Sequence, residues 1–129
     1  MKLSLLKNTI QYKLSSAKKI PDDNVLASLI FEAMYYVAGR CIPSELIKSY
    51  SDYNERVLRH LDNGRFISIP EYPDFLKGDR HLLIDEDLTY AVINYTSFII
   101  TQNPIYKQEA DEIINEHIAN EVAENGIDE

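Results

Sequence analysis

The feature that most constrains this chain is the spacing of its apolar residues after Asp22. They recur at intervals of three and four over about five helical turns, which places them on one face of an α-helix. Asp22, Asp23 and Asn24 stand directly before this run and offer side chains that cap a helix N-terminus. The sequence therefore predicts a long amphipathic helix over 23–41. Its predicted buried face is Leu26, Leu29, Ile30, Ala33, Met34, Val37, Ala38 and Cys41.

Four further segments show helical spacing. The predicted helices lie near 3–18, 23–41, 52–62, 86–101 and 105–123, and the Asn-Gly pair at 63–64 is a typical left-handed helix stop. At 129 residues the chain has the length of one domain. We therefore expect a single, mainly all-α domain over 1–129, built from about five helices with one long irregular or partly extended excursion between the third and fourth.

This excursion covers residues 64–84. Compact domains usually connect their elements through about 4–6 residues, and much longer connections are usually either functional or disordered. The many large apolar side chains of 64–84 argue against disorder. We therefore predict an interaction loop or hairpin that is ordered against a partner or against the helices. The candidate contact residues are Phe66, Ile67, Ile69, Tyr72, Phe75 and Leu76.

Charge is distributed unevenly along the chain. Residues 1–19 contain five lysines and no acid, whereas the residues after Lys107 contain eight acids and no base, which equals the whole formal net charge of −8. Opposite charge at the two ends favours pairing between copies and disfavours direct binding to nucleic acid. We therefore predict that the acidic C-terminal helix and tail, 105–129, is an assembly surface. The candidate charged contacts are Lys2, Lys7, Lys13, Glu109, Glu112 and Glu116.

The histidines do not predict a metal site. The three of them are far apart, and none has a second histidine four residues away, which is the spacing that binds zinc on a helix. Glu112 and Glu116 lie beside His117, but Ile114 stands where a di-iron bundle has its glutamate. We therefore interpret these acids as a solvated or interfacial face.

The acidic residues at 79 and 85–87 do not fit a calcium loop, because apolar residues at 82–84 occupy the positions of the central ligands. We interpret the three acids at 85–87 as the start of a helix, where the helix dipole favours negative charge. The sequence contains no glycine-rich phosphate loop and no nucleophile motif. We expect no enzyme, no cofactor and no metal.

The sequence also predicts no membrane association. The most apolar stretch, 91–100, is interrupted by polar residues and falls short of the roughly 20 apolar residues that span a bilayer. The single cysteine, Cys41, cannot form an internal disulfide, which favours an intracellular or virion-interior setting. Its place at the end of an apolar run predicts a buried side chain.

Two segments carry a resemblance to a known family. The segment 21–41 reads PDDNVLASLIFEAMYYVAGRC, an acidic pair followed by a Leu-x-x-Leu-Ile-x-x-Ala helix. It resembles the opening helix of the head–tail connector (adaptor, or head completion) proteins of tailed bacteriophages. The segment 88–98, LTYAVINYTSF, is similar to the closing half of that family. The resemblance covers about residues 20–108.

The resemblance implies a structural subunit of the virion. Such subunits form a ring, typically of about twelve copies, through heterologous contacts that close on themselves. The ring lies beneath the portal protein, meets a tail or stopper protein, and lets double-stranded DNA pass as cargo. The implied location is the head–tail interface of the virion, with host cytoplasm as the place of assembly.

Two other classes stay open from the residues alone. The first is a small helical regulator or adaptor that binds a basic protein through its acidic C-terminal helix. The second is an enzyme. A connector subunit is often monomeric until it meets the portal, whereas a regulator more often forms a stable dimer, so the mass of the purified chain distinguishes these classes.

Overall fold

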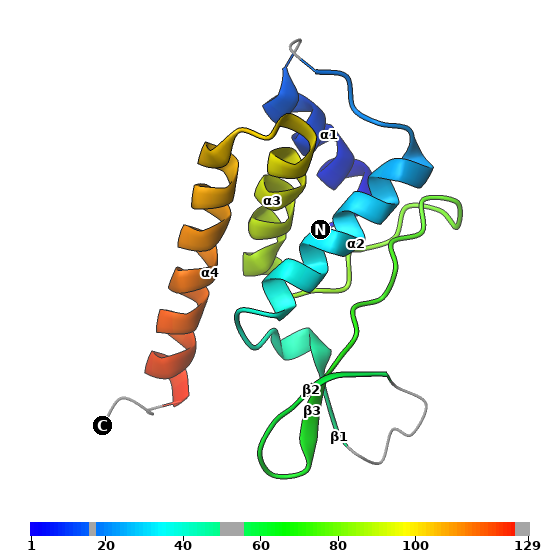
Figure 1. Cartoon of the computed structure of the whole chain (residues 1–129). Helices are drawn as coiled ribbons and strands as arrows, with labels where there is room; N and C mark the ends of the chain where they lie inside the picture. Colours follow the sequence, from blue (N-terminus) through cyan, green and yellow to red (C-terminus); the bar gives the residue numbers. More distant parts are fainter. Residues whose placement is uncertain (16–17, 50–55, 126–129) are drawn as a thin grey trace.

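The computed structural model describes residues 1–15, 18–49 and 56–125, with the side chains of 122–125 excluded (Figure 1). Within these residues the chain forms four α-helices, two short 3₁₀-helices and one three-stranded sheet. In chain order the elements are α1 (Leu3–Leu14), α2 (Asp23–Ala38), η1 (Ser44–Leu46), β1 (Ile47–Ser49), β2 (Val57–His60), β3 (Arg65–Ser68), η2 (Glu86–Leu88), α3 (Thr89–Thr101) and α4 (Pro104–Asn125).

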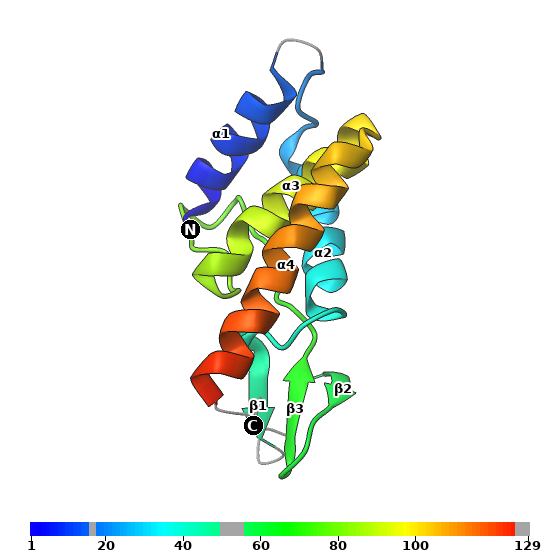
Figure 2. The ribbon, with the colours of Figure 1, turned by 90° about the vertical axis from the view of Figure 1, so that its left-hand side faces the viewer.

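Helix α3 lies at the centre of a helical bundle and contacts α1, α2 and α4 (Figures 1 and 2). It has no charged residue, and most of its side chains are buried. Two of its buried polar side chains bond to their own helix: Asn94 Nδ2 donates to the carbonyl of Tyr90, and Ser97 Oγ donates to that of Ile93, each at 2.8 Å. Such internal bonds let polar side chains lie in an apolar core at low cost.

The start of α1 is joined to the segment that precedes α3. Leu3 N donates to the carbonyl of Arg80 and Leu82 N donates to that of Met1, both at 2.8 Å, and the N-terminal ammonium pairs with Glu86. Residues far apart in sequence therefore lie side by side here.

The sheet stands at one end of the bundle, below the C-terminal end of α2 (Figure 1). Its strand order is β1-β3-β2, and both pairings are antiparallel. A small apolar cluster of Ala38, Leu46 and Ile67, separate from the main core, joins the sheet to α2. Arg59 adds a polar link, because its guanidinium donates to the carbonyls of Ala38 and Cys41 at 2.6 Å each.

The prediction of an all-α fold is wrong. The fold is mixed α/β, and β2 occupies part of the segment 52–62 that was predicted to be helical; residues 52–55 lie outside the described residues. Short apolar runs fit a strand as well as a helix. Asn63 and Gly64 have consecutive positive φ angles of 63° and 70°, as in a type I′ hairpin turn. The Asn-Gly pair therefore turns β2 back onto β3, and does not end a helix.

The predicted face of α2 is largely confirmed. Its residues Leu26, Ile30, Ala33, Met34 and Val37 are buried, whereas Leu29 is only half-buried. The helix ends at Ala38 rather than at residue 41. Cys41 is buried just beyond that end.

Candidate functional site

An open cavity of about 900 Å³ lies where the sheet meets the helical bundle. It is lined by residues of the η1–β1 segment, the β2–β3 hairpin, the start of η2 and the C-terminal half of α4. The charged or titratable side chains among them are Asp62, Arg65, Asp85, Asp87, His117 and Glu121. We call this space the acidic cavity, because it contains four carboxylates against one arginine and one histidine.

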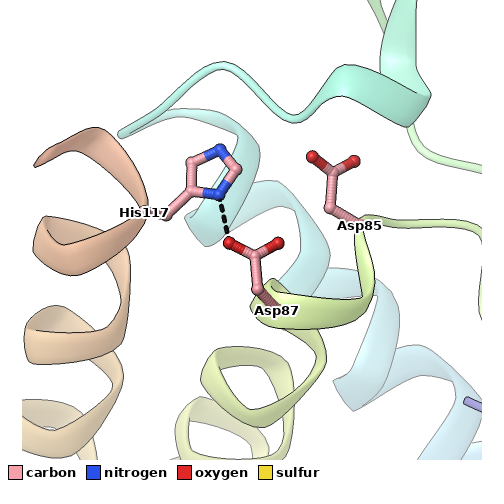
Figure 3. Close-up of side chains that lie close together, drawn as sticks. All are labelled: Asp85, Asp87 and His117. Carbon is pink, nitrogen blue, oxygen red and sulfur yellow. Dashed lines mark hydrogen bonds and ion pairs between the residues drawn. The ribbon is translucent and has the colours of Figure 1, made fainter. Parts of the chain in front are cut away.

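His117 is the most buried of these side chains, with 9% of its surface exposed. Its Nδ1 lies 2.5 Å from Asp87 Oδ2 (Figure 3). On the other side of the ring, Nε2 lies 3.4 Å from the carbonyl oxygen of Ile42 and 4.0 Å from Glu121 Oε2. Three separate parts of the chain, α4, η2 and the segment between α2 and η1, therefore meet at one imidazole.

Asp85 holds the same region from a second point. Its two carboxylate oxygens accept hydrogen bonds from the backbone amides of Ser44 and Glu45, each at 2.7 Å. These amides belong to the first turn of η1, which has no capping side chain of its own. Asp85 therefore acts as a cap supplied from a distant part of the chain.

The ligand atoms of Asp85, Asp87 and His117 lie within 4.8 Å of one another, which raises the question of a bound cation. Both oxygens of Asp85 accept backbone amides, and Nδ1 of His117 lies at hydrogen-bond distance from Asp87. Both nitrogens of the imidazole face oxygen atoms, so the structure shows this group as a hydrogen-bonded ion pair.

The electrostatic surroundings favour the charged form of His117. Burial lowers its pKa, but the hydrogen bonds to Asp87 and Ile42 and the nearby charge of Asp85 outweigh burial, and the net pKa is raised. Neighbouring Cys41 behaves differently: burial raises the pKa of its thiol to about 12. The thiol therefore stays neutral, which fits a packing residue and not a nucleophile.

Sequence reasoning missed this cluster. It compared His117 with Glu112 and Glu116 on its own helix, but the partner is Asp87, 30 residues away. One signal was present, since His117 lies on the apolar stripe of its helix between Ile114 and Ile118. A histidine on a buried stripe requires a polar partner from another element.

The predicted contact residues of the excursion divide into two groups. Phe66 and Ile67 of β3 are buried within the fold, at 1% and 0% exposure, and Ile69 and Phe75 are partly buried. Tyr72 and Leu76 reach solvent, at 50% and 88% exposure. The surface available to a partner therefore centres on these two.

The predicted charged contacts are also divided. Lys7 Nζ lies 2.7 Å from Asp23 Oδ1, and Lys13 Nζ lies 4.0 Å from Glu109 Oε2, so these charges are partnered within the chain. Lys2, Glu112 and Glu116 are exposed. Glu112 and Glu116 form no ion pair with the residues that the structure describes.

Comparisons with family models, with curated proteins and with solved structures gave no match. The similarity to phage connectors therefore rests on the sequence pattern alone. In the described part of the chain, none of the helices combines the length and the apolar composition that a bilayer crossing requires.

Proposed function

We propose that this protein is a structural head–tail connector (adaptor) subunit of a tailed-phage virion, without catalytic activity. In this proposal, copies form a ring beneath the portal protein, contact a tail or stopper protein, and surround a channel through which double-stranded DNA passes. The subunit assembles in host cytoplasm and ends at the head–tail interface.

One observation carries the proposal: residues 70–84 form an anchored segment that presents apolar side chains to solvent. Pro70, Pro73 and Leu82 are buried, and Phe75 packs against the main core. From this anchored backbone Tyr72, Leu76 and Leu83 are 50%, 88% and 47% exposed. Exposed apolar groups on an ordered segment are typical of an assembly surface.

The charge on α4 supports the same proposal. Glu112 and Glu116 project from the helix without an ionic partner among the described residues. An acidic surface facing the channel would repel DNA phosphates and keep the genome from binding as it passes. An acidic surface facing a neighbouring copy would instead meet exposed bases such as Lys2, Lys77 and Arg80.

The experiment is coexpression with the portal protein encoded in the same genome, followed by electron microscopy of the purified complex. We expect the parent chain to add a ring of density to one end of the portal. Exchanging both Tyr72 and Leu76 for serine removes the apolar contacts and should abolish the ring. Tyr12→Ser is the matched control, because Tyr12 is 86% exposed on α1 and outside the proposed surface.

Two results would contradict the proposal. The first is a source genome without a portal gene, and the second is a parent chain that stays separate from the portal. The exposed acids of α4 also fit the alternative, a helical regulator that binds a basic protein. That alternative predicts a stable dimer in solution and binding to basic proteins without the portal.

A further inference from the structure

The segment that connects α2 to the sheet makes polar contacts with residues of the helical bundle. The Ile42 carbonyl faces His117 Nε2 at 3.4 Å, and two residues further on the amides of Ser44 and Glu45 donate to Asp85. The next residues are η1 and β1, the first strand of the sheet. The position of this entry segment, 42–46, therefore depends on groups carried by α4 and η2.

Space for movement exists beside this segment. The acidic cavity of about 900 Å³ separates the sheet from α4 and η2, and Ile42, Ser44 and Ile47 line it. The apolar cluster that joins the sheet to α2 is small, with Ala38, Leu46 and Ile67 as its buried members. Because this apolar contact is small and lies beside an open cavity, much of the positioning of the entry segment falls to polar bonds.

The two sides of the His117 ring respond differently to loss of a proton. Asp87 is a carboxylate and accepts only, so Nδ1 keeps its hydrogen when the ring is neutral. The remaining lone pair is then on Nε2 and points toward the carbonyl oxygen of Ile42, which also has lone pairs. A hydrogen bond in the charged ring becomes a repulsive contact in the neutral ring. The bond to the entry segment is therefore the one that depends on the proton.

The groups around the ring favour the proton. Asp85, directly before η2, and Asp87 of η2 face the ring, and Glu121 lies 4.0 Å from it on the same helix as His117. From the sheet side, Asp62 and Arg65 line the same cavity with opposite charges. From the end of α2 comes the thiol of Cys41, which stays neutral because its pKa is about 12. The negative charges of Asp87 and Asp85 stabilise the imidazolium.

We propose that His117 is a proton-dependent latch: in its charged form it bridges Asp87 and the Ile42 carbonyl and holds the sheet against the helical bundle, and loss of the proton releases the entry segment 42–46. Release loosens the entry segment around Ile42, while the bonds of Asp85 and Arg59, which do not depend on this proton, keep the sheet attached to the bundle. In a connector subunit this would alter which surfaces a neighbouring protein meets at that end.

The pH range follows from the direction of the shift. Folding raises the pKa of His117 above its usual value of about 6.5. A group with a raised pKa stabilises the closed form fully below the pKa of the open form, and this stabilisation is lost as pH rises through the pKa of the closed form. The latch is therefore closed in mildly acidic solution and opens as the solution becomes alkaline.

Amide hydrogen exchange tests the latch on the full chain across a pH series, after correction for the intrinsic pH dependence of exchange. In the parent, protection of 42–49 should fall as pH rises, by roughly tenfold for each unit by which closure raises the pKa of His117. Protection of α2 should stay constant. His117→Gln, whose amide cannot lose a proton in this range, should make the protection of 42–49 independent of pH. His81→Gln is the control and should behave as the parent, because His81 is exposed.

If His117→Gln does not fold, a second variant and a second measurement still test the proposal. Asp87→Asn removes the carboxylate and should move the transition to lower pH. Nitrogen NMR of the parent's imidazoles should show both nitrogens of His117 protonated near pH 6, and Nε2 alone deprotonated at higher pH. A neutral His117 near pH 6, or protection of 42–49 that stays constant with pH in the parent, would overturn the proposal.

Discussion

Arg59 of β2 donates a hydrogen bond of 2.6 Å to the carbonyl of Ala38, the last residue of α2. The same guanidinium donates a second bond to the carbonyl of Cys41. Carbonyls at a helix C-terminus have no hydrogen-bond donor within the helix. The Arg59 side chain, which belongs to the sheet, supplies a donor to the last carbonyl of α2. This link fixes the sheet to the bundle where the apolar contact is small.

The first prediction is that Arg59→Met loosens the sheet. The change keeps an apolar stem but leaves carbonyls unsatisfied, which typically costs about 1–3 kcal/mol. Urea unfolding should show this loss, and hydrogen exchange should locate it in β1, β2 and β3. Arg56→Met is the matched control, because Arg56 is exposed. Equal stability of the two variants would show that the guanidinium bonds contribute nothing net.

The second prediction separates two neighbouring residues of α2. Ile30 is completely buried, so Ile30→Ala should lower the free energy of unfolding by about 2–5 kcal/mol. Leu29 is half-buried, so Leu29→Ala should cost clearly less. Circular dichroism during urea unfolding measures both. A larger loss at Leu29 would mean that the helix presents a different face to α3.

The third prediction concerns the N-terminus of α1. Ser4 donates from its amide to Asp79 Oδ1 at 3.0 Å and from its hydroxyl to Oδ2 at 2.6 Å, whereas the residue at the helix start, Lys2, gives no side-chain cap. Asp79→Asn should weaken this remote cap and speed amide exchange in the first turn of α1. Glu71→Gln, a change at another exposed acid, should leave that exchange unchanged.

The Asp79 contact also has a defined pH dependence. The hydroxyl and the amide of Ser4 lower the pKa of Asp79. A lowered pKa means that the contact contributes fully above the pKa of the unfolded chain, about 3.9, and is lost as pH falls through the lower pKa of the folded chain. Exchange at Ser4 should therefore become faster only in strongly acidic solution. Faster exchange beginning near neutral pH would contradict this assignment.

The helices were largely predictable because their signals are local. The apolar spacing and the Asp22 cap of α2 lie within the helix or next to it, and the structure shows Asp22 Oδ1 accepting from Val25 N. The sheet was not predictable in this way. Its strands have three or four residues, too short for a clear period, and β2 is fixed by the bonds of Arg59 to carbonyls 18 and 21 residues away.

The ion pair between Lys13 and Glu109 was not predictable for a related reason. The separation of bases at one end from acids at the other favoured pairing between copies, and this stays a prediction. The structure in addition brings Lys13 and Glu109 together in one chain, because α1 and α4 both pack on α3. Nearby, the Tyr106 hydroxyl donates to the carbonyl of Lys13 at 2.8 Å. Helix packing decides which charged side chains are paired within the chain and which stay exposed to a partner. The sequence alone does not show this packing.

The last prediction compares acids of α4 that have no ionic partner among the described residues with Glu109, which faces Lys13. Glu112 and Glu116 are exposed, so the double change to glutamine should slow association with the portal, or self-association if none occurs, and reduce its dependence on salt. The reason is that exposed charges mainly affect encounter rate and are screened when the Debye length falls to about 8 Å at 0.15 M salt. Glu109→Gln is the matched control and should have a smaller effect, because Glu109 already faces Lys13. Equal rates and equal salt dependence in the parent and the double variant would assign Glu112 and Glu116 to a solubilising face with no role in assembly.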